Sequence, residues 1–287
     1  MDSNSPIQPE NKQPTLSEDF YDIAKGMISA ITAFRKTLDE WTPTIQNALS
    51  NISKVASVLL ESIQQMQLSS YTQEELDELK SRYISWGTYG WTPHPLSLND
   101  EFQIFPDSMQ QADSLMSPLL TEEAISELYK AILDYSDTVP QDFEEAFYEY
   151  SSGKYRICAL ILFSLIERTL IMTQSLDATM RENRRVSCGG IKNFGKQINN
   201  TRTENMFIYA WILEENVIAC LQAMYQNSAN FQVEPPLINR HFIEHGMSNR
   251  ETTRVECLKL FLLYHNVLFL SQWIESQPPY FHQIKEV

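Results

Sequence analysis

The sequence predicts an all-α protein, built as a helical bundle with an N-terminal helical extension. Apolar residues recur at the spacing of a helix face along most of the chain, and the strict alternation that indicates strands is rare. The 287 residues include only 8 glycines and 13 prolines, so few positions interrupt a helix. With 43% hydrophobic residues, a chain of this length can bury a sizeable core in one or two domains.

The N-terminal region is expected over residues 17–115, after a tail. Residues 1–16 are rich in Pro, Ser and Asn and lack periodicity, which predicts a disordered tail. Ser17 is a good N-cap, and helical patterns follow over 17–34 and 45–66. The second pattern has an apolar face that fits packing on another helix or on a second copy of the chain.

A capped helix and a loop rich in aromatic residues follow. Thr72, with Glu75 three residues later, predicts a capping box and a helix over 72–83. The segment SWGTYGWTPHPLS then indicates a loop. Four ring-bearing residues alternate with Gly and Pro in it: Trp86, Tyr89, Trp91 and His94. Such rings more often anchor a loop to the core than stack on nucleic-acid bases. Residues 96–118 carry few helix signals and predict a linker with a soft domain boundary.

The C-terminal domain is expected over residues 120–287, as a succession of helices. Helical patterns occupy 121–135, 141–150, 153–176, 205–225 and 251–273. The third pattern is apolar on nearly all sides, which predicts a helix at the centre of the domain. Its Glu167 needs a partner because burying an unpaired carboxylate is costly, and Arg168 and Arg240 are the candidates.

Charge is divided unevenly along the chain. The net charge of −15 argues against a nucleic-acid binder, because phosphate contacts need basic residues. However, residues 1–150 hold 25 acidic and 8 basic residues, whereas residues 151–287 hold 12 acidic and 14 basic residues. A predicted loop over 181–202 contains six basic residues: Arg181, Arg184, Arg185, Lys192, Lys196 and Arg202. This loop is either solvated surface or a contact for a polyanion, and the first five of these residues are the candidate RNA contacts.

Cysteine usage and hydropathy favour a cytoplasmic protein. The four cysteines are far apart, form no CxxC pair and lie mostly within apolar runs, as is typical of a reducing compartment. The polar N-terminus shows no export signal. Charged or amide side chains interrupt the apolar runs at 157–172 and 258–274, which favours core helices over membrane spans.

A compact polar cluster lies ahead of the last helical pattern. Arg240, His241, Glu244 and His245 fall within six residues, between a Pro-Pro pair and a glycine. These flanking residues predict a short turn or helix end. The apolar helix that follows from Glu251 would hold the cluster against a rigid element, so we expect the chain's chemistry here.

This arrangement resembles the HEPN superfamily of small helical domains. In that family four to six residues separate an Arg from a His, and Asn, Asp or His is preferred immediately after the Arg. Here Arg240-His241-Phe242-Ile243-Glu244-His245 has a spacer of four. The resemblance covers roughly residues 121–287 and implies a metal-independent endoribonuclease without a cofactor, acting on RNA as a homodimer whose two Arg/His motifs face one cleft. It also implies a toxin or antiviral effector, with a regulatory partner or antitoxin as an option.

The resemblance assigns roles to individual residues. It makes Arg240 the phosphate clamp and His245 the general acid or base, with His241 assisting. An imidazole can take the proton of the RNA 2′-hydroxyl while a guanidinium stabilises the charge on phosphate. Glu167 and Asn239 would support Arg240 rather than react. On a helix, five residues put Arg240 and His245 about 140° apart, which favours a site completed by a second copy.

Other interpretations are open. Arg240 could pair with Glu244 one turn later, and His245 could be a core histidine. His241 and His245 have the spacing of two metal ligands, although no third-ligand motif accompanies them. The domain could also be a non-catalytic helical module for dimerisation or partner binding. If it is a nuclease, the acidic first half either extends the dimer interface or shields the basic cleft.

Overall fold

The computed structural model of the chain describes residues 72–94, 100–135, 140–174, 185–201, 208–227 and 229–276. Helices are the only regular secondary structure within these ranges, which confirms the all-α prediction. The tail predicted for residues 1–16 and the helices predicted over 17–34 and 45–66 lie outside the described residues.

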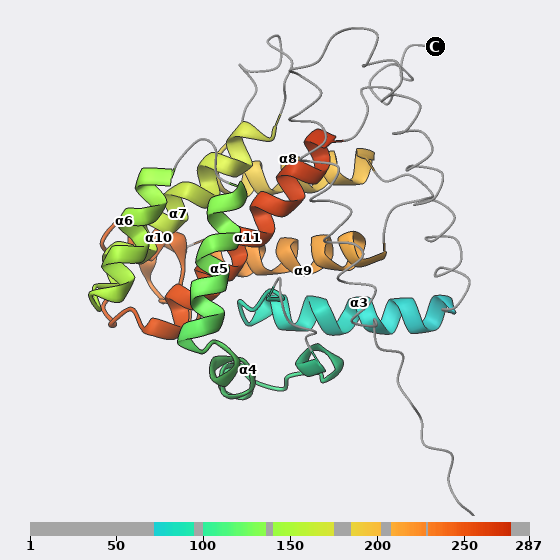
Figure 1. The fold of residues 1–287 in the computed structure, drawn as a ribbon, viewed down its shortest axis with the longest axis horizontal. Coiled ribbons are helices and arrows are strands. Elements are labelled where there is room, and N and C mark those ends of the chain that lie inside the picture. Colours follow the sequence, from blue (N-terminus) through green and yellow to red (C-terminus); the bar gives the residue numbers. More distant parts are fainter. Residues whose placement is uncertain are drawn as a thin grey trace, which may run out of the picture.

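Figure 1 shows how the helices of the described residues are arranged. They are α3 (Gln73–Thr88), α4 (Met109–Met116), α5 (Glu122–Tyr135), α6 (Pro140–Ser151), α7 (Tyr155–Met172), α8 (Ser187–Thr201), α9 (Ile208–Met224), α10 (Arg240–Glu244) and α11 (Arg254–Ser276). Three 3-10 turns join them: η1 (Asp100–Gln103), η2 (Ser117–Leu119) and η4 (Ala229–Phe231). The predictions for α5, α6, α7, α9 and α11 are therefore confirmed, with small shifts at their ends.

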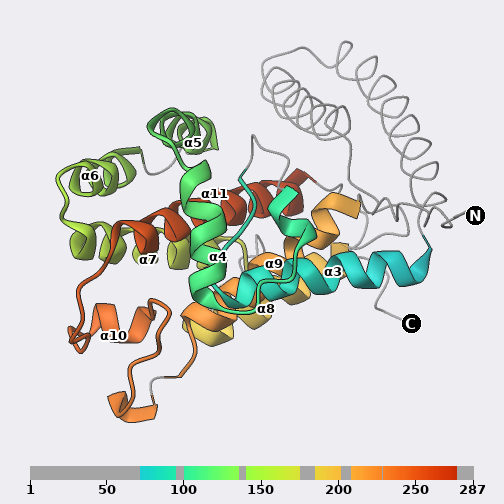
Figure 2. The same ribbon diagram turned by 90° about the horizontal axis from the view of Figure 1, so that it is seen from below.

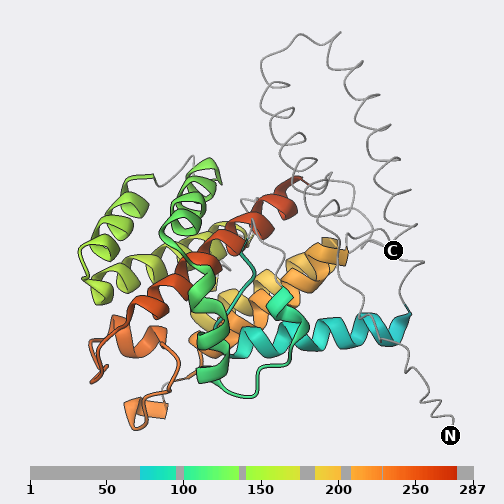
Figure 3. The ribbon, with the colours of Figure 1, turned by 60° about the horizontal axis from the view of Figure 1, so that its bottom comes forward.

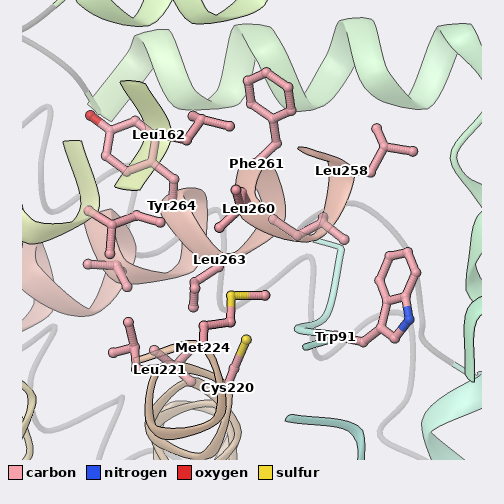
Figure 4. Close-up of a cluster of buried hydrophobic side chains, with 14 of the residues drawn as sticks. Trp91, Leu162, Cys220, Leu221, Met224, Leu258, Leu260, Phe261, Leu263 and Tyr264 are labelled. Atoms are coloured by element: carbon pink, nitrogen blue, oxygen red, sulfur yellow. The ribbon is translucent and has the colours of Figure 1, made fainter. Parts of the chain in front are cut away.

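The long helix α11 forms the centre of the bundle. It contacts α5, α7, α8 and α9, and in Figure 1 it crosses the molecule between α5 and α9. Figure 4 shows Leu263 facing Leu221 and Met224 of α9, while Phe261 points the other way, and all four side chains are buried. A helix with neighbours on several sides must be apolar on several faces, which explains its composition.

This central place was predicted for the helix over 153–176 instead. That helix, α7, buries one face but leaves Ile157 and Met172 44% and 52% exposed. Among the described residues, α11 is also the helix that is long and apolar enough to cross a membrane, over Arg254–Ile274, and 72% of its apolar window is buried in the bundle. Buried core helices have the same length and composition.

Helix α3 lies along α9, as Figure 3 shows, and begins with the predicted capping box. The Thr72 hydroxyl accepts from the Glu75 N–H at 3.2 Å, and the Glu75 carboxylate accepts from the Thr72 N–H at 2.7 Å. The helix continues to Thr88, so the start of the predicted loop is helical. Gly87 permits this close packing, because a Cβ there would lie 2.5 Å from the backbone oxygen of Asn216.

The two tryptophans of the aromatic segment anchor it to the core. Trp86 and Trp91 are both fully buried. The Trp86 indole donates to the carbonyl of Ile104, and the Trp91 indole to the carboxylate of Asp113, each at 2.8 Å. Rings that are buried and satisfied in this way cannot stack on nucleic-acid bases, so the anchoring interpretation holds for both.

The prediction of a linker over 96–118 is wrong for the described part of that segment. It forms η1, α4 and most of η2, and the Ser108 hydroxyl caps α4 by accepting from the Gln111 N–H at 3.2 Å. Phe102 and Met116 are buried in the same core as α5, α7, α9 and α11. These helices are too short to show a helical period, which is why the sequence pattern missed them.

The basic segment over 181–202, predicted as a loop, contains the helix α8. Three apolar side chains one turn apart, Ile191, Phe194 and Ile198, are buried, while Lys192 and Lys196 point to solvent. Two glycines in the first turn of α8 weaken its helical signal in the sequence. Of the other basic residues, Arg185 is exposed, and Arg181, Arg184 and Arg202 lie outside the described residues.

Candidate functional site

Helix α10 carries the polar cluster and is held at both ends. Asn239 is its N-cap: its side-chain oxygen accepts from the N–H groups of His241 at 3.0 Å and Phe242 at 3.4 Å. The Asn239 amide also donates to the carbonyl of Gln226 at 3.0 Å, which ties the start of α10 to the end of α9. Gly246, with φ +67°, ends the helix. Asn239 is 2% exposed, so it supports the site by positioning α10.

The helix lies at one end of the bundle. Figure 2 shows α10 beside α7, with η4 further out, and α10 contacts α7. Phe242 and Ile243 are buried and fix this contact. The other three side chains of α10, those of Arg240, His241 and Glu244, are partly exposed to solvent.

Arg240 is the partner of two carboxylates. Its Nη2 contacts Oε2 of Glu167 and lies 2.7 Å from Oε2 of Glu244, and its Nε donates to Oε1 of Glu244 at 2.9 Å. The guanidinium carbon lies 5.5 Å from the centre of the Tyr225 ring. The Arg240 side chain is 15% exposed. The sequence offered Glu167 and Glu244 as alternative partners, and the structure brings both to the same guanidinium.

Glu167 joins α7, α8 and α10. While Oε2 meets Arg240, Oε1 accepts from the Ser187 N–H at the start of α8, at 2.8 Å. Its side chain is 12% exposed. The partner expected for this carboxylate is therefore Arg240 and not Arg168. Ser187 adopts φ +53°, a rare conformation for a residue other than glycine, which points its N–H at the carboxylate.

The two imidazoles lie on the neighbouring face of α10. The rings of His241 and His245 are almost parallel, at 7°, with centroids 6.2 Å apart. His245 is exposed and packs against the Phe231 ring of η4 at 5.6 Å, so it is not a core histidine. Burial lowers the pKa of His241, and the charge of Arg240 and the nearby His245 add to this effect. His241 is therefore a neutral imidazole near pH 7, able to accept a proton.

Formal charge at the site is negative. Glu167 and Glu244 contribute two negative charges and Arg240 one positive charge. Burial raises the pKa of Glu244, and Glu167 acts in the same direction, while Arg240 opposes them. Glu244 therefore gains a proton more readily than a carboxylate paired with an arginine alone.

Sequence reasoning missed two residues of this site, Tyr225 and Ser187. Tyr225 is fully buried, and among the described residues neither its hydroxyl nor that of Ser187 has a hydrogen-bond partner. Burial raises the pKa of Tyr225 well above its usual value, and Glu167 adds to the shift. Tyr225 follows an apolar helix and Ser187 lies in a basic segment, so neither stands out in the sequence.

Three of the basic residues predicted to contact RNA are described, and they lie on α8 or just before it. Arg185 lies two residues before the start of α8, and its backbone N–H donates to Oε1 of Gln174 at 2.6 Å. Lys192 and Lys196 lie one turn apart on the exposed face of α8. The first residue of α8, Ser187, contacts Glu167, so the helix that carries these two lysines begins at the site.

Within the described residues, no three His, Cys, Asp or Glu side chains lie close enough together to hold a metal ion. His241 and His245 thus form a pair without a third such ligand. No protein-family model matches the chain, and neither a curated protein nor a solved structure is detectably similar to it. The likeness to HEPN domains accordingly stays a resemblance carried by the motif of Arg240 and His245.

Proposed function

We propose that the protein is a metal-independent endoribonuclease of the HEPN type, with Arg240, His241 and His245 as its catalytic residues. The observation that carries the proposal is that one guanidinium and two imidazoles lie within six residues, on α10 and its C-cap His245, and that burial lowers the pKa of one imidazole, His241. These are the groups that cleavage of RNA by its own 2′-hydroxyl requires.

The chemistry needs one proton acceptor and one proton donor. Neutral His241 takes the proton of the 2′-hydroxyl, and the oxygen attacks the adjacent phosphorus. Arg240 stabilises the negative charge added to the phosphate, and protonated His245 gives its proton to the departing 5′-oxygen. The products are a 2′,3′-cyclic phosphate and a 5′-hydroxyl, and no metal ion or cofactor takes part.

We further propose that the active form is a homodimer in which two α10 helices face each other. Arg240 and Glu244 share one face of α10, while the two imidazoles share the next, so one copy does not aim all three groups at one point. Two apolar side chains near α10, Val233 and Met247, are 74% and 45% exposed, which fits burial against a second copy.

The setting proposed for this nuclease is that of a toxin or antiviral effector in the cytoplasm, with no membrane association, controlled by a regulatory partner or antitoxin. The exposed cations on α8 support RNA as the substrate, because they would contact phosphates flanking the cleaved bond.

A second function is favoured by the contacts of Arg240 itself. A guanidinium that is already paired with Glu167 and Glu244 resembles a structural ion pair, and the net charge of −15 opposes RNA binding. By this account the domain is a non-catalytic helical module for dimerisation or partner binding.

Incubation of the purified protein with RNA in the presence of a chelator separates the two functions. Arg240→Lys and His245→Ala remove a candidate group each, and Arg168→Ala is the matched control because Arg168 is exposed on α7 one residue from Glu167. Cleavage by wild type and Arg168→Ala, but by neither site variant, supports the nuclease. Equal cleavage by all four proteins indicates a contaminant, and none by any supports the interaction module.

Mixed dimers test whether the site is shared. If Arg240 of one copy works with His245 of the other, co-assembly of Arg240→Lys and His245→Ala chains rebuilds one intact site in each mixed dimer. Random assembly then restores about a quarter of wild-type activity. No restoration, with mixed dimers present, would show that each site lies within one chain.

A further inference from the structure

The two carboxylates that pair with Arg240 are held differently. Glu167 is fixed at both oxygens, one by Arg240 and the other by the Ser187 N–H at 2.8 Å. Among the described residues, the Glu244 carboxylate bonds only Arg240, through Oε1 at 2.9 Å and Oε2 at 2.7 Å. It is the last residue of α10, and its side chain is 21% exposed. Glu244 can therefore leave the guanidinium without breaking any other hydrogen bond or ion pair of the described residues.

Glu167 and Glu244 occupy the hydrogen-bond donors of Arg240 that a phosphate would use. A guanidinium holds a phosphate with two parallel hydrogen bonds, from Nε with Nη2 or from Nη1 with Nη2. Both arrangements use Nη2, whose two hydrogens serve Glu167 and Glu244. With Glu244 in place, a phosphodiester would also approach a trio that carries a formal charge of −1.

We propose that Glu244 closes the site: it holds the Nε and Nη2 donors of Arg240 until a phosphodiester takes over the same two hydrogen bonds. This inference rests on the proposed function and adds a positioning residue to it. Glu167 keeps its own hydrogen of Nη2 in both states, so Arg240 does not move away from α7 when the site opens. A phosphodiester group fits because, like the carboxylate, it presents two oxygens to the fork.

The charged groups around Glu244 give closure a pH dependence. Arg240 contacts it, and Glu167 and His245 act on it electrostatically. Since burial raises the pKa of Glu244, this carboxyl gains a proton at a higher pH than a free one and then releases the guanidinium. Phosphate binding should strengthen as the pH falls through that pKa. Because these other charged groups also act on the site, a variant must isolate the part of Glu244.

The test uses Glu244→Gln, which keeps the size of the side chain and removes its charge. The probe is a fluorescent RNA oligonucleotide with every 2′-hydroxyl methylated, so that it binds without being cleaved. Glu215→Gln is the matched control: Glu215 is also paired with a cation, Lys80 at 2.7 Å, and is 24% exposed, but it lies on α9. Removal of one negative charge at contact distance should tighten binding roughly threefold to tenfold at pH 7.5.

Three accompanying measurements locate the effect. The gain should shrink as the pH falls through the raised pKa of Glu244, because the wild-type carboxyl then loses its charge as well. Cys188 is exposed beside Ser187, and the other three cysteines are buried, so the oligonucleotide should protect one fast-reacting thiol. Arg240→Lys should bind less tightly than wild type, because an ammonium cannot form the fork.

Each outcome is decisive. Tighter binding by Glu244→Gln but not by Glu215→Gln supports closure, and if natural RNA stays uncut the nuclease proposal alone fails. Equal binding by Glu244→Gln and wild type, with Arg240→Lys weaker, overturns closure and leaves the nuclease intact. If Arg240→Lys binds as well as wild type, phosphate does not meet Arg240 and both proposals fail.

Discussion

Replacing Arg240 by Ala is expected to destabilise the fold in addition to removing the phosphate clamp. The guanidinium stands between Glu167 and Glu244, whose side chains are only 12% and 21% exposed. Without it, two partly buried carboxylates face each other, and the Ser187 N–H is the one donor left to them among the described residues. Removing one partner of a fully buried pair costs about 3–5 kcal/mol. Because both carboxylates keep some access to water, we expect a loss of about 2–4 kcal/mol in the free energy of unfolding.

The size of this loss should depend on pH. In Arg240→Ala the two carboxylates repel each other, and the pKa of Glu244, which burial raises and Arg240 opposes, loses that opposing charge and rises further in the folded state. A group with a raised folded-state pKa destabilises the fold increasingly as the pH rises through that pKa. The difference in stability between variant and wild type should therefore grow between pH 5 and pH 8. Urea unfolding at both pH values measures it, and the Tm at pH 8 should fall by roughly 4–12 °C.

Arg240→Lys is the control for this experiment, because it keeps a positive charge between the carboxylates and should lose less stability than Arg240→Ala. If Arg240→Ala were as stable as wild type at pH 8, Arg240 would not be the shared partner of Glu167 and Glu244. A loss of the same size at pH 5 and pH 8 would point to lost packing on Tyr225 instead of lost charge pairing.

Three further predictions follow from the same structure. Gly87→Ala should cost roughly 1–3 kcal/mol of unfolding free energy, because its Cβ would lie 2.5 Å from a backbone oxygen of α9. Gly195→Ala, whose Cβ would meet only an ordinary contact at 3.5 Å, should not destabilise the protein in the same urea assay. Replacing Lys192 and Lys196 together by Ala should flatten the plot of log Kd for single-stranded RNA against log salt by about 1.4, and an unchanged slope would exclude both from the phosphate path. The acid limb of the profile of kcat/KM against pH should lie below about 6.5, since the pKa of His241 is lowered, and a limb well above that value would rule out His241 as the base.

Long helices with a clear apolar period were predictable from the sequence. The capping box of Thr72 and Glu75 was also predictable, because its two residues lie three positions apart in the sequence. The need of Glu167 for a cation followed from the cost of burying a carboxylate, and Arg240 fills that need. These features depend on local spacing or on a single energetic requirement.

Features that depend on tertiary contacts could not be predicted in this way. Helix α4 spans eight residues, too few to establish a period, and α8 begins with a glycine-rich turn. Tyr225 and Ser187 join the site only because the end of α9 and the start of α8 meet beside α7. The sequence also does not show that the guanidinium of Arg240 contacts both Glu167 and Glu244, because Glu167 is brought to it by the tertiary fold.

The central claim is that Arg240 and the imidazoles of α10 cleave a phosphodiester by means of the RNA 2′-hydroxyl. Oligonucleotides with one unmodified ribose, placed in turn beside each base in an otherwise 2′-O-methylated strand, test it most directly. In the presence of chelator, wild-type protein should cut only after the unmodified ribose and leave a 2′,3′-cyclic phosphate, and His245→Ala should not. Cleavage at methylated positions, or cleavage that the chelator abolishes, would contradict the claim.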